Sequence, residues 1–317
     1  RDCLLSRGLG DVYKRQDEKL SPEVIEYLNA EGVAVDDYDN IIDALNSYDG
    51  YTLLIDPATT NYTLSQLRGN FNLVSAPSPV PEMKAIKNEV ECNGFRNAMQ
   101  RDGVAMVKFI KWLEEAVPKG CETELSVSAK LRQLRAEQPL FKDESFDTIA
   151  GYEEHGAIVH YEPTPDTDVP LRPEGFLLLD SGAQYLDGTT DITRTIQLGK
   201  VTDLHRRVYT LVLKGHLSLQ NLCFPRGAAG TQLDAVARVA MWREGMNFMH
   251  GTGHGVGSYL SVHEGPHQIR QEYRPAPMLE GMTVTDEPGL YLAGKFGVRI
   301  ENTLLTVPYM TTEFGKF

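Results

Sequence analysis

Five potential metal ligands lie in the second half of the chain, each beside a strand-like or glycine-rich segment: Asp180, Asp191, His254, Glu287 and Glu301. One imidazole and four carboxylates form a hard, oxygen-rich ligand set that suits two divalent cations. A pair of such ions can hold an attacking nucleophile and a developing oxyanion together. The set therefore predicts a hydrolase.

The size and charge of the chain exclude several classes of protein. Its 317 residues are enough for two domains and a sizeable core. A formal net charge of -13 argues against a nucleic-acid binder, which normally has a basic patch. No apolar stretch approaches the roughly 20 residues that a membrane span needs. The four cysteines are widely spaced and form no CxxC pair, so we expect them to be reduced and structural.

Three segments of different character divide the chain. Residues 1–16 have no clear periodicity and resemble translated adapter sequence, so we expect a non-native leader there. Residues 17–78 are typical of part of a small α/β middle domain. A proline-rich joint at 77–81 marks the boundary, and residues 79–317 form the larger domain. The end of the chain, 313–317, is typical of the start of a strand, so we expect this domain to be truncated at its C-terminus.

Hydrophobic periodicity predicts alternating helices and strands. Ser21 and Pro22 favour a helix start, and 33–35 and 51–55 are typical of short buried strands. The apolar residues from Met83 to Leu113 predict one long helix or a broken pair, because Gly94 and Gly103 weaken its middle. Further helices are predicted at 122–137, 204–222 and 231–243, and strands at 176–179, 191–196, 282–287 and 296–305.

Asp180 and Asp191 flank a predicted hairpin. An aspartate after Phe-Leu-Leu-Leu is costly to bury unless a positive group meets it. A two-residue turn at Asp187-Gly188 would offset the two aspartates by four residues, so we expect a wider loop, or a bulge at Gly182. Facing carboxylates repel each other unless they share a proton or a metal. The alternative is a pair of ordinary strand-end and turn aspartates.

The segment from His250 to Gly257 combines two histidines with four glycines. Glycines allow the backbone to come close to a ligand, and the lysine of a phosphate-binding P-loop is absent. His263 follows within a Val-His-Glu-Gly-Pro segment. A lone histidine is usually packed or on the surface, but three around one glycine-rich loop favour a functional site.

Two further segments carry polar residues beside apolar ones. Arg299 and Glu301 alternate with Val298 and Ile300, so one face of this strand is polar and could line a cleft. The alternative is an ion pair on the surface. His160 ends an apolar segment that we predict to be a strand, and its alternative is a core histidine with a backbone partner.

Together these segments resemble Xaa-Pro aminopeptidase (aminopeptidase P) in order and spacing, from about Pro81 to the end. The unit before the joint resembles the back part of the middle domain of the long, three-domain form of that family. The resemblance implies an α+β, pita-bread domain: a curved antiparallel sheet packed by helix pairs with pseudo-twofold symmetry. The segments that carry it are Gly-Ala-Ile-Val-His160-Tyr, Leu-Leu-Asp180-Ser-Gly-Ala-Gln-Tyr, Thr-Thr-Asp191-Ile-Thr-Arg-Thr, His250-Gly-Thr-Gly-His254-Gly-Val-Gly, Val-His263-Glu-Gly-Pro, Asp-Glu287-Pro-Gly and Arg299-Ile-Glu301-Asn.

The resemblance implies a dinuclear metal site. Asp180 would bind one ion, His254 and Glu287 the other, and Asp191 and Glu301 would bridge the two. The ions would be manganese, with zinc and cobalt also compatible with these ligands.

The resemblance also implies roles around the metals. Glu287 would move a proton from the nucleophile towards the leaving proline nitrogen, and His263 would polarise the scissile carbonyl. His160 and His250 would line the proline pocket, His160 with a hydrogen bond to the peptide, and Arg299 would belong to the substrate site. An extra carboxylate at Asp286 would add negative charge.

The implied activity is removal of the N-terminal residue from peptides with proline in second position, by a nucleophile that two metal ions activate. The implied protein is cytoplasmic, binds peptides rather than nucleic acid or membrane, and forms a homodimer at full length. One alternative is a prolidase, which has the same ligands and cleaves dipeptides. Another is a non-catalytic pita-bread binding module, against which the complete ligand set argues.

Overall fold

The computed structural model describes residues 4–7, 11–14, 20–67 and 69–317, and the chain divides into two compact units, Arg1–Pro79 and Val80–Phe317. The leader predicted at residues 1–16 lies partly outside the described residues.

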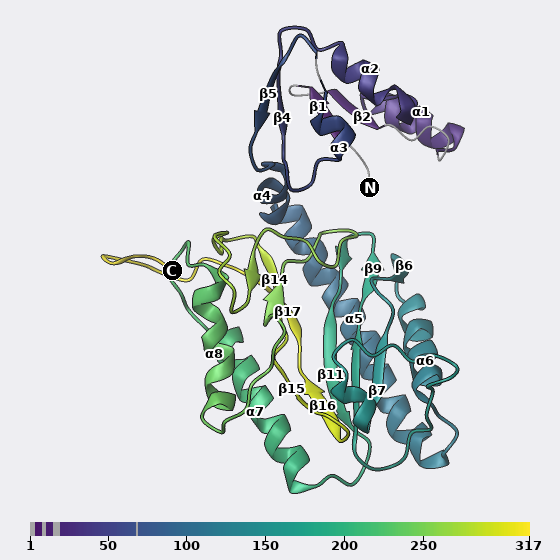
Figure 1. Cartoon of the computed structure of the whole chain (residues 1–317). Helices are drawn as coiled ribbons and strands as arrows, with labels where there is room; N and C mark the ends of the chain where they lie inside the picture. Colours follow the sequence, from purple (N-terminus) through teal and green to yellow (C-terminus); the bar gives the residue numbers. More distant parts are fainter. Residues whose placement is uncertain (1–3, 8–10, 15–19, 68) are drawn as a thin grey trace. The chain divides into compact units, whose positions relative to one another are not determined.

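The first unit contains two small sheets and short helices (Figure 1). In one sheet the central strand pairs antiparallel with one neighbour and parallel with the other, and the second sheet is a parallel pair. The three-stranded sheet consists of β1 (Leu4–Arg7), β2 (Asp11–Lys14) and β3 (Val33–Val35), and the pair of β4 (Thr52–Ile55) and β5 (Asn72–Ser75). The α-helices are α1 (Pro22–Ala30), α2 (Ile41–Asn46) and α3 (Tyr62–Ser65).

The sequence located these elements well and their burial poorly. The Ser21 side chain accepts a hydrogen bond from the backbone N–H of Val24, which confirms the predicted helix start. Strands at 33–35 and 52–55 are confirmed, but their residues alternate between exposed and half-buried, so the prediction of buried strands was wrong. Among residues 20–67 and 69–79, only Ile41 and Leu45 are buried.

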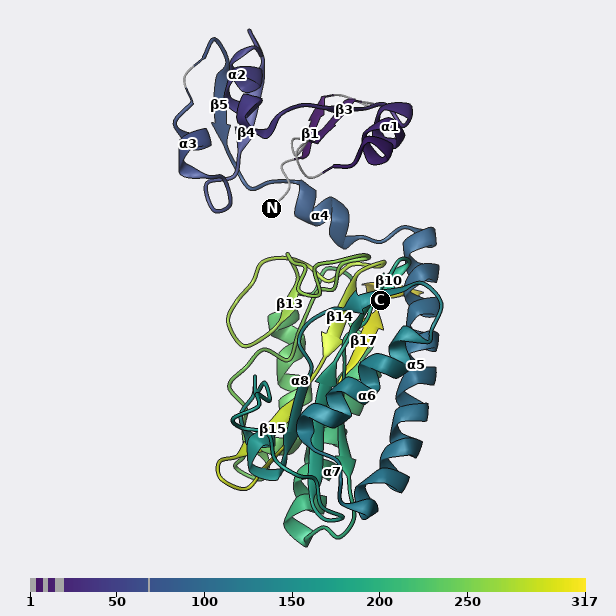
Figure 2. The same ribbon diagram turned by 90° about the vertical axis from the view of Figure 1, so that its right-hand side faces the viewer.

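The second unit places strands between two helix pairs (Figure 1). In Figure 2 the pair α5 and α6 faces the viewer, and α7 and α8 lie beyond the strands. The helices of this unit are α4 (Val80–Ala85), α5 (Glu89–Ala116), α6 (Glu124–Ala136), α7 (Asp203–Gln220) and α8 (Gly230–Trp242), with 3-10 turns η3 (Val117–Lys119) and η4 (Glu153–Ala157). None of the helices within the described ranges combines the length and the hydropathy that a membrane crossing requires.

All paired strands of this unit run antiparallel to their neighbours. Three-stranded sheets have the orders β11-β8-β7 and β10-β9-β6, and the others are pairs. The strands are β6 (Phe141–Glu144), β7 (Ile149–Tyr152), β8 (Phe176–Ser181), β9 (Ala183–Tyr185), β10 (Gly188–Thr189), β11 (Ile192–Gln197), β12 (Gly253–His254), β13 (Gln268–Ile269), β14 (Thr283–Asp286), β15 (Gly289–Leu292), β16 (Phe296–Arg299), β17 (Asn302–Leu305), β18 (Thr311–Thr312) and β19 (Gly315–Lys316).

Each helix pair packs on its own part of the core. One apolar cluster joins α5 and α6 to β8, with Phe109 and Leu179 fully buried. A second joins α7 and α8 to β15 and β16, with Val212 and Val298 fully buried. Removal of this apolar area from water stabilises the packing of helices on strands. The polar ends of the strands are thereby gathered between two rigid supports.

The helical region predicted from Met83 to Leu113 is a broken pair, with the break at residues 86–88. Asn88 and Glu91 cap α5 reciprocally: each side chain accepts a hydrogen bond from the backbone N–H of the other. The helix continues through Gly94 and Gly103, contrary to the expected weakness there. A β-carbon at Gly94 would overlap the carbonyl oxygen of Asp187, so this glycine lets α5 pack closely against the β9–β10 turn.

Candidate metal centre

The hairpin of β8 and β11 positions the two aspartates on one face. Thr193 lies opposite Asp180, and Tyr185 lies opposite Gly188 in the same register, so the turn is the pair Leu186-Asp187. Asp191 is therefore displaced by two residues from Asp180, and side chains two apart on a ladder share a face. The predicted wider loop, or bulge at Gly182, was wrong: a two-residue turn one position earlier than expected gives the alignment.

Asp180 is buried at the end of an entirely buried strand, and a cation meets it as its burial requires. Arg299 donates to Oδ2 of Asp180 from Nη2 at 2.6 Å and from Nε at 3.2 Å. The other oxygen, Oδ1, is buried and has no hydrogen-bond partner among the described residues. Arg299 is itself 1% exposed, so the alternative of a surface ion pair was wrong.

His254 is oriented by its own backbone surroundings. Its N–H donates to Oγ1 of Thr285 at 3.0 Å, and its Nδ1 lies 2.9 Å from the carbonyl oxygen of Gly255. A proton on Nδ1 satisfies that carbonyl and leaves the Nε2 lone pair free to bind a metal. Nε2 faces two carboxylates, at 3.4 Å from Asp191 and 3.6 Å from Glu287.

Asp286 and Asn302 form the terminal pair of β14 and β17. Glu287 follows Asp286 and Glu301 precedes Asn302, so both glutamates lie just beyond the paired ends of these strands. Thr285 donates to Oε1 of Glu287 at 3.1 Å, and Thr193 donates to Oε2 of Glu301 at 2.6 Å. These hydroxyl groups fix both carboxylates without neutralising them. The strand alternation predicted for Arg299 and Glu301 therefore places both on the polar face, as expected.

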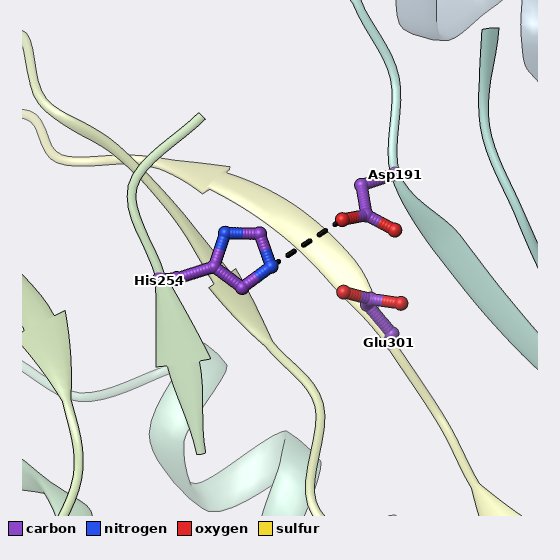
Figure 3. Close-up of side chains that lie close together, drawn as sticks. All are labelled: Asp191, His254 and Glu301. Atoms are coloured by element: carbon purple, nitrogen blue, oxygen red, sulfur yellow. Dashed lines mark ion pairs between the residues drawn. The ribbon is translucent and has the colours of Figure 1, made fainter. Parts of the chain in front are cut away.

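Three of these side chains converge most tightly (Figure 3). Asp191, His254 and Glu301 point towards one another from separate segments, and each offers a ligand atom within 4.8 Å of the others. The carboxylates are crowded as well as buried. Burial raises the pKa of Asp191 and of Glu301, and the neighbouring carboxylates add to the effect. Burial raises the pKa of Glu287 to about 7.

The remaining predicted histidines surround this cluster. Nε2 of His250 lies 2.8 Å from the Tyr291 hydroxyl, and burial lowers the pKa of His250 to about 4. The His263 ring lies 4.2 Å from the His254 ring, and burial lowers its pKa below the ordinary value. His160 is exposed within a turn after η4, so neither the predicted strand nor a core histidine is present there.

A cavity of about 360 Å³ unites the site. It lies within the second unit, and its walls also include Phe146, Ile149, Val159, Gln268 and Arg270. All nine residues singled out from the sequence line it: His160, Asp180, Asp191, His250, His254, His263, Glu287, Arg299 and Glu301.

The extra carboxylate of Asp286 is not among the residues that line the cavity, and it lies 3.1 Å from Nδ1 of buried His216. Tyr291 was missed, although its hydroxyl accepts a hydrogen bond from Arg299 at 2.8 Å. Tyr291 pairs with Gly297, which lies two residues before Arg299 on β16. The alternation of side chains along a strand would therefore have placed Tyr291 on the same face as Arg299.

Comparisons with known proteins agree with this geometry. Residues 93–308 match the sequence model of metallopeptidase family M24, and residues 12–91 match that of the creatinase/prolidase N-terminal domain. The chain is 42% identical over 315 residues to a probable Xaa-Pro aminopeptidase P from Aspergillus fumigatus, covering 94% of this chain and 48% of that protein. It is 44% identical over 296 residues to Xaa-Pro aminopeptidase 1 from Dictyostelium discoideum, covering 90% and 47%. The chain thus spans about half the length of these curated relatives.

Solved structures show the same fold. An X-prolyl aminopeptidase from Caenorhabditis elegans matches with a TM-score of 0.87 and 34% identity, over 96% of this chain and 51% of that one. A prolidase from Pyrococcus furiosus matches with a TM-score of 0.78 and 26% identity, over 94% and 84%. The predicted α+β, pita-bread architecture is confirmed. With its ligand set gathered at one cavity and most of its length matched, the chain belongs to metallopeptidase family M24.

Proposed function

We propose that this chain carries the active site of a metal-dependent aminopeptidase that removes the N-terminal residue from peptides with proline in second position. The observation that carries the proposal is the convergence of His254 with Asp180, Asp191, Glu287 and Glu301 at one cavity. Relatives named Xaa-Pro aminopeptidase support it, as does similarity to a worm enzyme described as cytosolic with a di-nuclear active site.

The residues fit divalent cations on their own evidence. Oδ1 of Asp180 is buried without a partner, and Nε2 of His254 is free to bind a metal. Burial raises the pKa of Asp191, Glu287 and Glu301, so the carboxylates hold protons where cations would stabilise them as anions. Oxygen and imidazole donors suit manganese, which we propose, and are also compatible with zinc and cobalt.

We assign the ligands to two ions. Asp180 would hold one, His254 and Glu287 would hold the other, and Asp191 and Glu301 would contribute to both. The ions would supply Lewis acidity and a water-derived nucleophile near neutral pH.

The chain's own groups then handle protons and orientation. Glu287 accepts a proton from the nucleophile and returns it to the leaving proline nitrogen, a role that its half-buried carboxylate at the cavity wall permits. His263, with its pKa lowered by burial, is neutral at pH 7 and donates a hydrogen bond to the developing oxyanion. His160 hydrogen-bonds the peptide. Arg299 belongs to the substrate site, where it holds Asp180 and Tyr291 in place.

The apolar wall fits a proline ring. Phe146, Ile149 and Val159 line the cavity together with His160 and His250. A rigid imino-acid ring buries apolar area there and loses little conformational entropy on binding. We further propose that the protein acts in the cytoplasm on peptides and that its full-length form is a homodimer.

A prolidase is the second candidate, because a prolidase structure matches with a TM-score of 0.78 and 26% identity. The deciding assay uses metal-stripped protein with and without added Mn²⁺, on Arg-Pro-Pro and on the dipeptide Arg-Pro. Metal-restored release of arginine from the tripeptide supports the aminopeptidase. Cleavage of the dipeptide alone supports the prolidase, and metal binding without cleavage of either peptide contradicts both.

A further inference from the structure

His263 has a ring that no hydrogen bond orients. Among the described residues, no group hydrogen-bonds either ring nitrogen, and the ring's neighbour is the His254 imidazole at 4.2 Å. The position of the His263 side chain is therefore set by the backbone of its loop. We call residues 255–267, which join β12 to β13, the His263 loop.

The His263 loop is folded tightly on itself at Glu264, the next residue. The N–H of Glu264 donates to the carbonyl oxygen of Gly255 at 2.7 Å, and a β-carbon at Gly255 would overlap the carbonyl oxygen of Glu264. The middle of the loop is held by the β9–β10 hairpin, since the N–H of Leu260 donates to Oε1 of Gln184 at 3.0 Å. A shift of Glu264 would therefore be transmitted directly to His263.

Two lysines contact the Glu264 carboxylate: Lys84 in the last turn of α4, and Lys87 in the break between α4 and α5. Nζ of Lys87 lies 3.3 Å from Oε1, and Nζ of Lys84 lies 2.8 Å from Oε2. Their surroundings differ sharply: the Lys84 side chain is 57% exposed, whereas that of Lys87 is 0% exposed and Glu264 is 10% exposed. The backbone N–H of Lys87 is also fixed, at 2.8 Å from the carbonyl oxygen of Gly281.

The two ion pairs differ in how strictly they constrain Glu264. A buried ammonium group without a partner is strongly destabilising, so Lys87 permits Glu264 few other positions. Burial lowers the pKa of Lys87 and Glu264 opposes this, which is the expected behaviour of a desolvated pair. The exposed Lys84 pair is screened by water and contributes little.

We propose that Lys87 is a positioning residue, which holds the His263 ring at the cavity through its buried ion pair with Glu264. The kinetic consequence rests on the proposed function, but the placement of the ring does not. Lys84 provides a matched control, because it contacts the same carboxylate from solvent.

The first test observes the ring directly. The full chain is labelled with ¹³C at the histidine rings, and the His263 signal is identified by its loss in His263→Ala, in both metal-free and zinc-loaded protein. Lys87→Met and Glu264→Gln should each shift or broaden that signal, and Lys84→Met should leave it in place. An unchanged His263 signal in Lys87→Met would overturn the proposal, whether or not the protein cleaves peptides.

The second test separates positioning from general support of the fold. Lys87→Met should lower kcat on Arg-Pro-Pro by about tenfold with KM and metal content unchanged, because small misplacements of a reacting group are costly. Lys87→Arg should restore part of the loss, and Lys84→Met should stay within about twofold of the parent. In a His263→Ala background, Lys87→Met should have no further effect on kcat, whereas losses that multiply would contradict action through His263.

The role of Lys87 can be tested even if the chain has no aminopeptidase activity. If the parent chain cleaves no peptide, the aminopeptidase assignment fails and the ring signal still decides the role of Lys87. If Lys87→Met does not fold, Glu264→Gln makes the same comparison, because it removes the charge of the ion pair and preserves side-chain volume. A normal His263 ring signal in Glu264→Gln would then contradict the proposal that the Lys87–Glu264 ion pair positions this ring.

Discussion

Glu287 should make the metal-free protein less stable as the pH rises. Burial raises its pKa from an ordinary value of 4.5 to about 7, and its side chain is 17% exposed. Below pH 4.5 the folded and unfolded states both carry the proton. Between pH 4.5 and about pH 7 only the folded state does, so it binds more protons and stability falls with rising pH. The shift corresponds to about 3 kcal/mol of unfolding free energy lost at pH 8.

Other groups titrate in the same window with the opposite sign, and a substitution separates them. His250, His263 and His267 have pKa values lowered by burial, so the unfolded state binds their protons more readily and they add stability as the pH rises. Glu287→Gln mimics the protonated acid and leaves these histidines in place. The variant should therefore match the parent at pH 4.5 and exceed it by about 3 kcal/mol at pH 8.

The assay is urea unfolding of EDTA-treated parent and Glu287→Gln protein at several pH values between 4.5 and 8. A difference between the two proteins that stays constant over this range would show that the Glu287 carboxylate does not hold a raised pKa in the folded state. Added Mn²⁺ should reverse the order at pH 8, because a cation that binds only the folded parent stabilises it by mass action and displaces protons.

Three further predictions test the site and its support. Asp191→Ala or Glu301→Ala should abolish paired metal binding, measured as bound metal per chain after dialysis; two retained ions would exclude the bridging roles. His263→Ala should lower kcat on Arg-Pro-Pro by about a hundredfold with metal content intact, as loss of an oxyanion donor does, and unchanged turnover would remove that role. Arg135→Met leaves a buried aspartate unpaired and should cost about 3 to 5 kcal/mol in urea unfolding, whereas Arg132→Met, at an exposed pair, should cost less than about 1 kcal/mol.

The proposed ligands at strand ends could be found from sequence because they interrupt a periodic apolar pattern, and His254 because it lies in a glycine-rich segment. Asp180 follows a run of buried leucines, and Glu301 lies two residues from Arg299 on an alternating strand. A polar residue at such a position must meet a compensating group, and here that group is another member of the site. The positions of helices and strands could be predicted because the spacing of apolar residues reflects which residues are buried.

The turn between Asp180 and Asp191 could not be placed correctly from sequence, because Gly188 is required for helix packing and not for the turn. Asp187-Gly188 is a strong turn signal, yet Gly188 lies in β10. A β-carbon there would approach Ala98 of α5 too closely, so helix packing requires this glycine. Tertiary contacts of this kind leave no local trace in the sequence.

The strand predicted before His160 failed for a related reason. Ile158 made the segment read as apolar, but its side chain is 55% exposed. Gly156 packs against the backbone of Gly151 and Gly297, which bends the chain into η4 instead of extending it. Sequence reasoning thus recovered which residues belong to the site, while backbone contacts between distant segments decided how His160 reaches it.

The spread of the ligands along the chain has a consequence for how the protein matures. Asp180 and Asp191 leave the ribosome first, and His254, Glu287 and Glu301 follow from segments that pair with one another only late in synthesis. A partly synthesised chain therefore offers a cation isolated carboxylates rather than a chelating site. The closely packed carboxylates also oppose the last step of assembly until protons or cations neutralise them. The proposed metal ions would accordingly stabilise the completed fold over a partly synthesised chain.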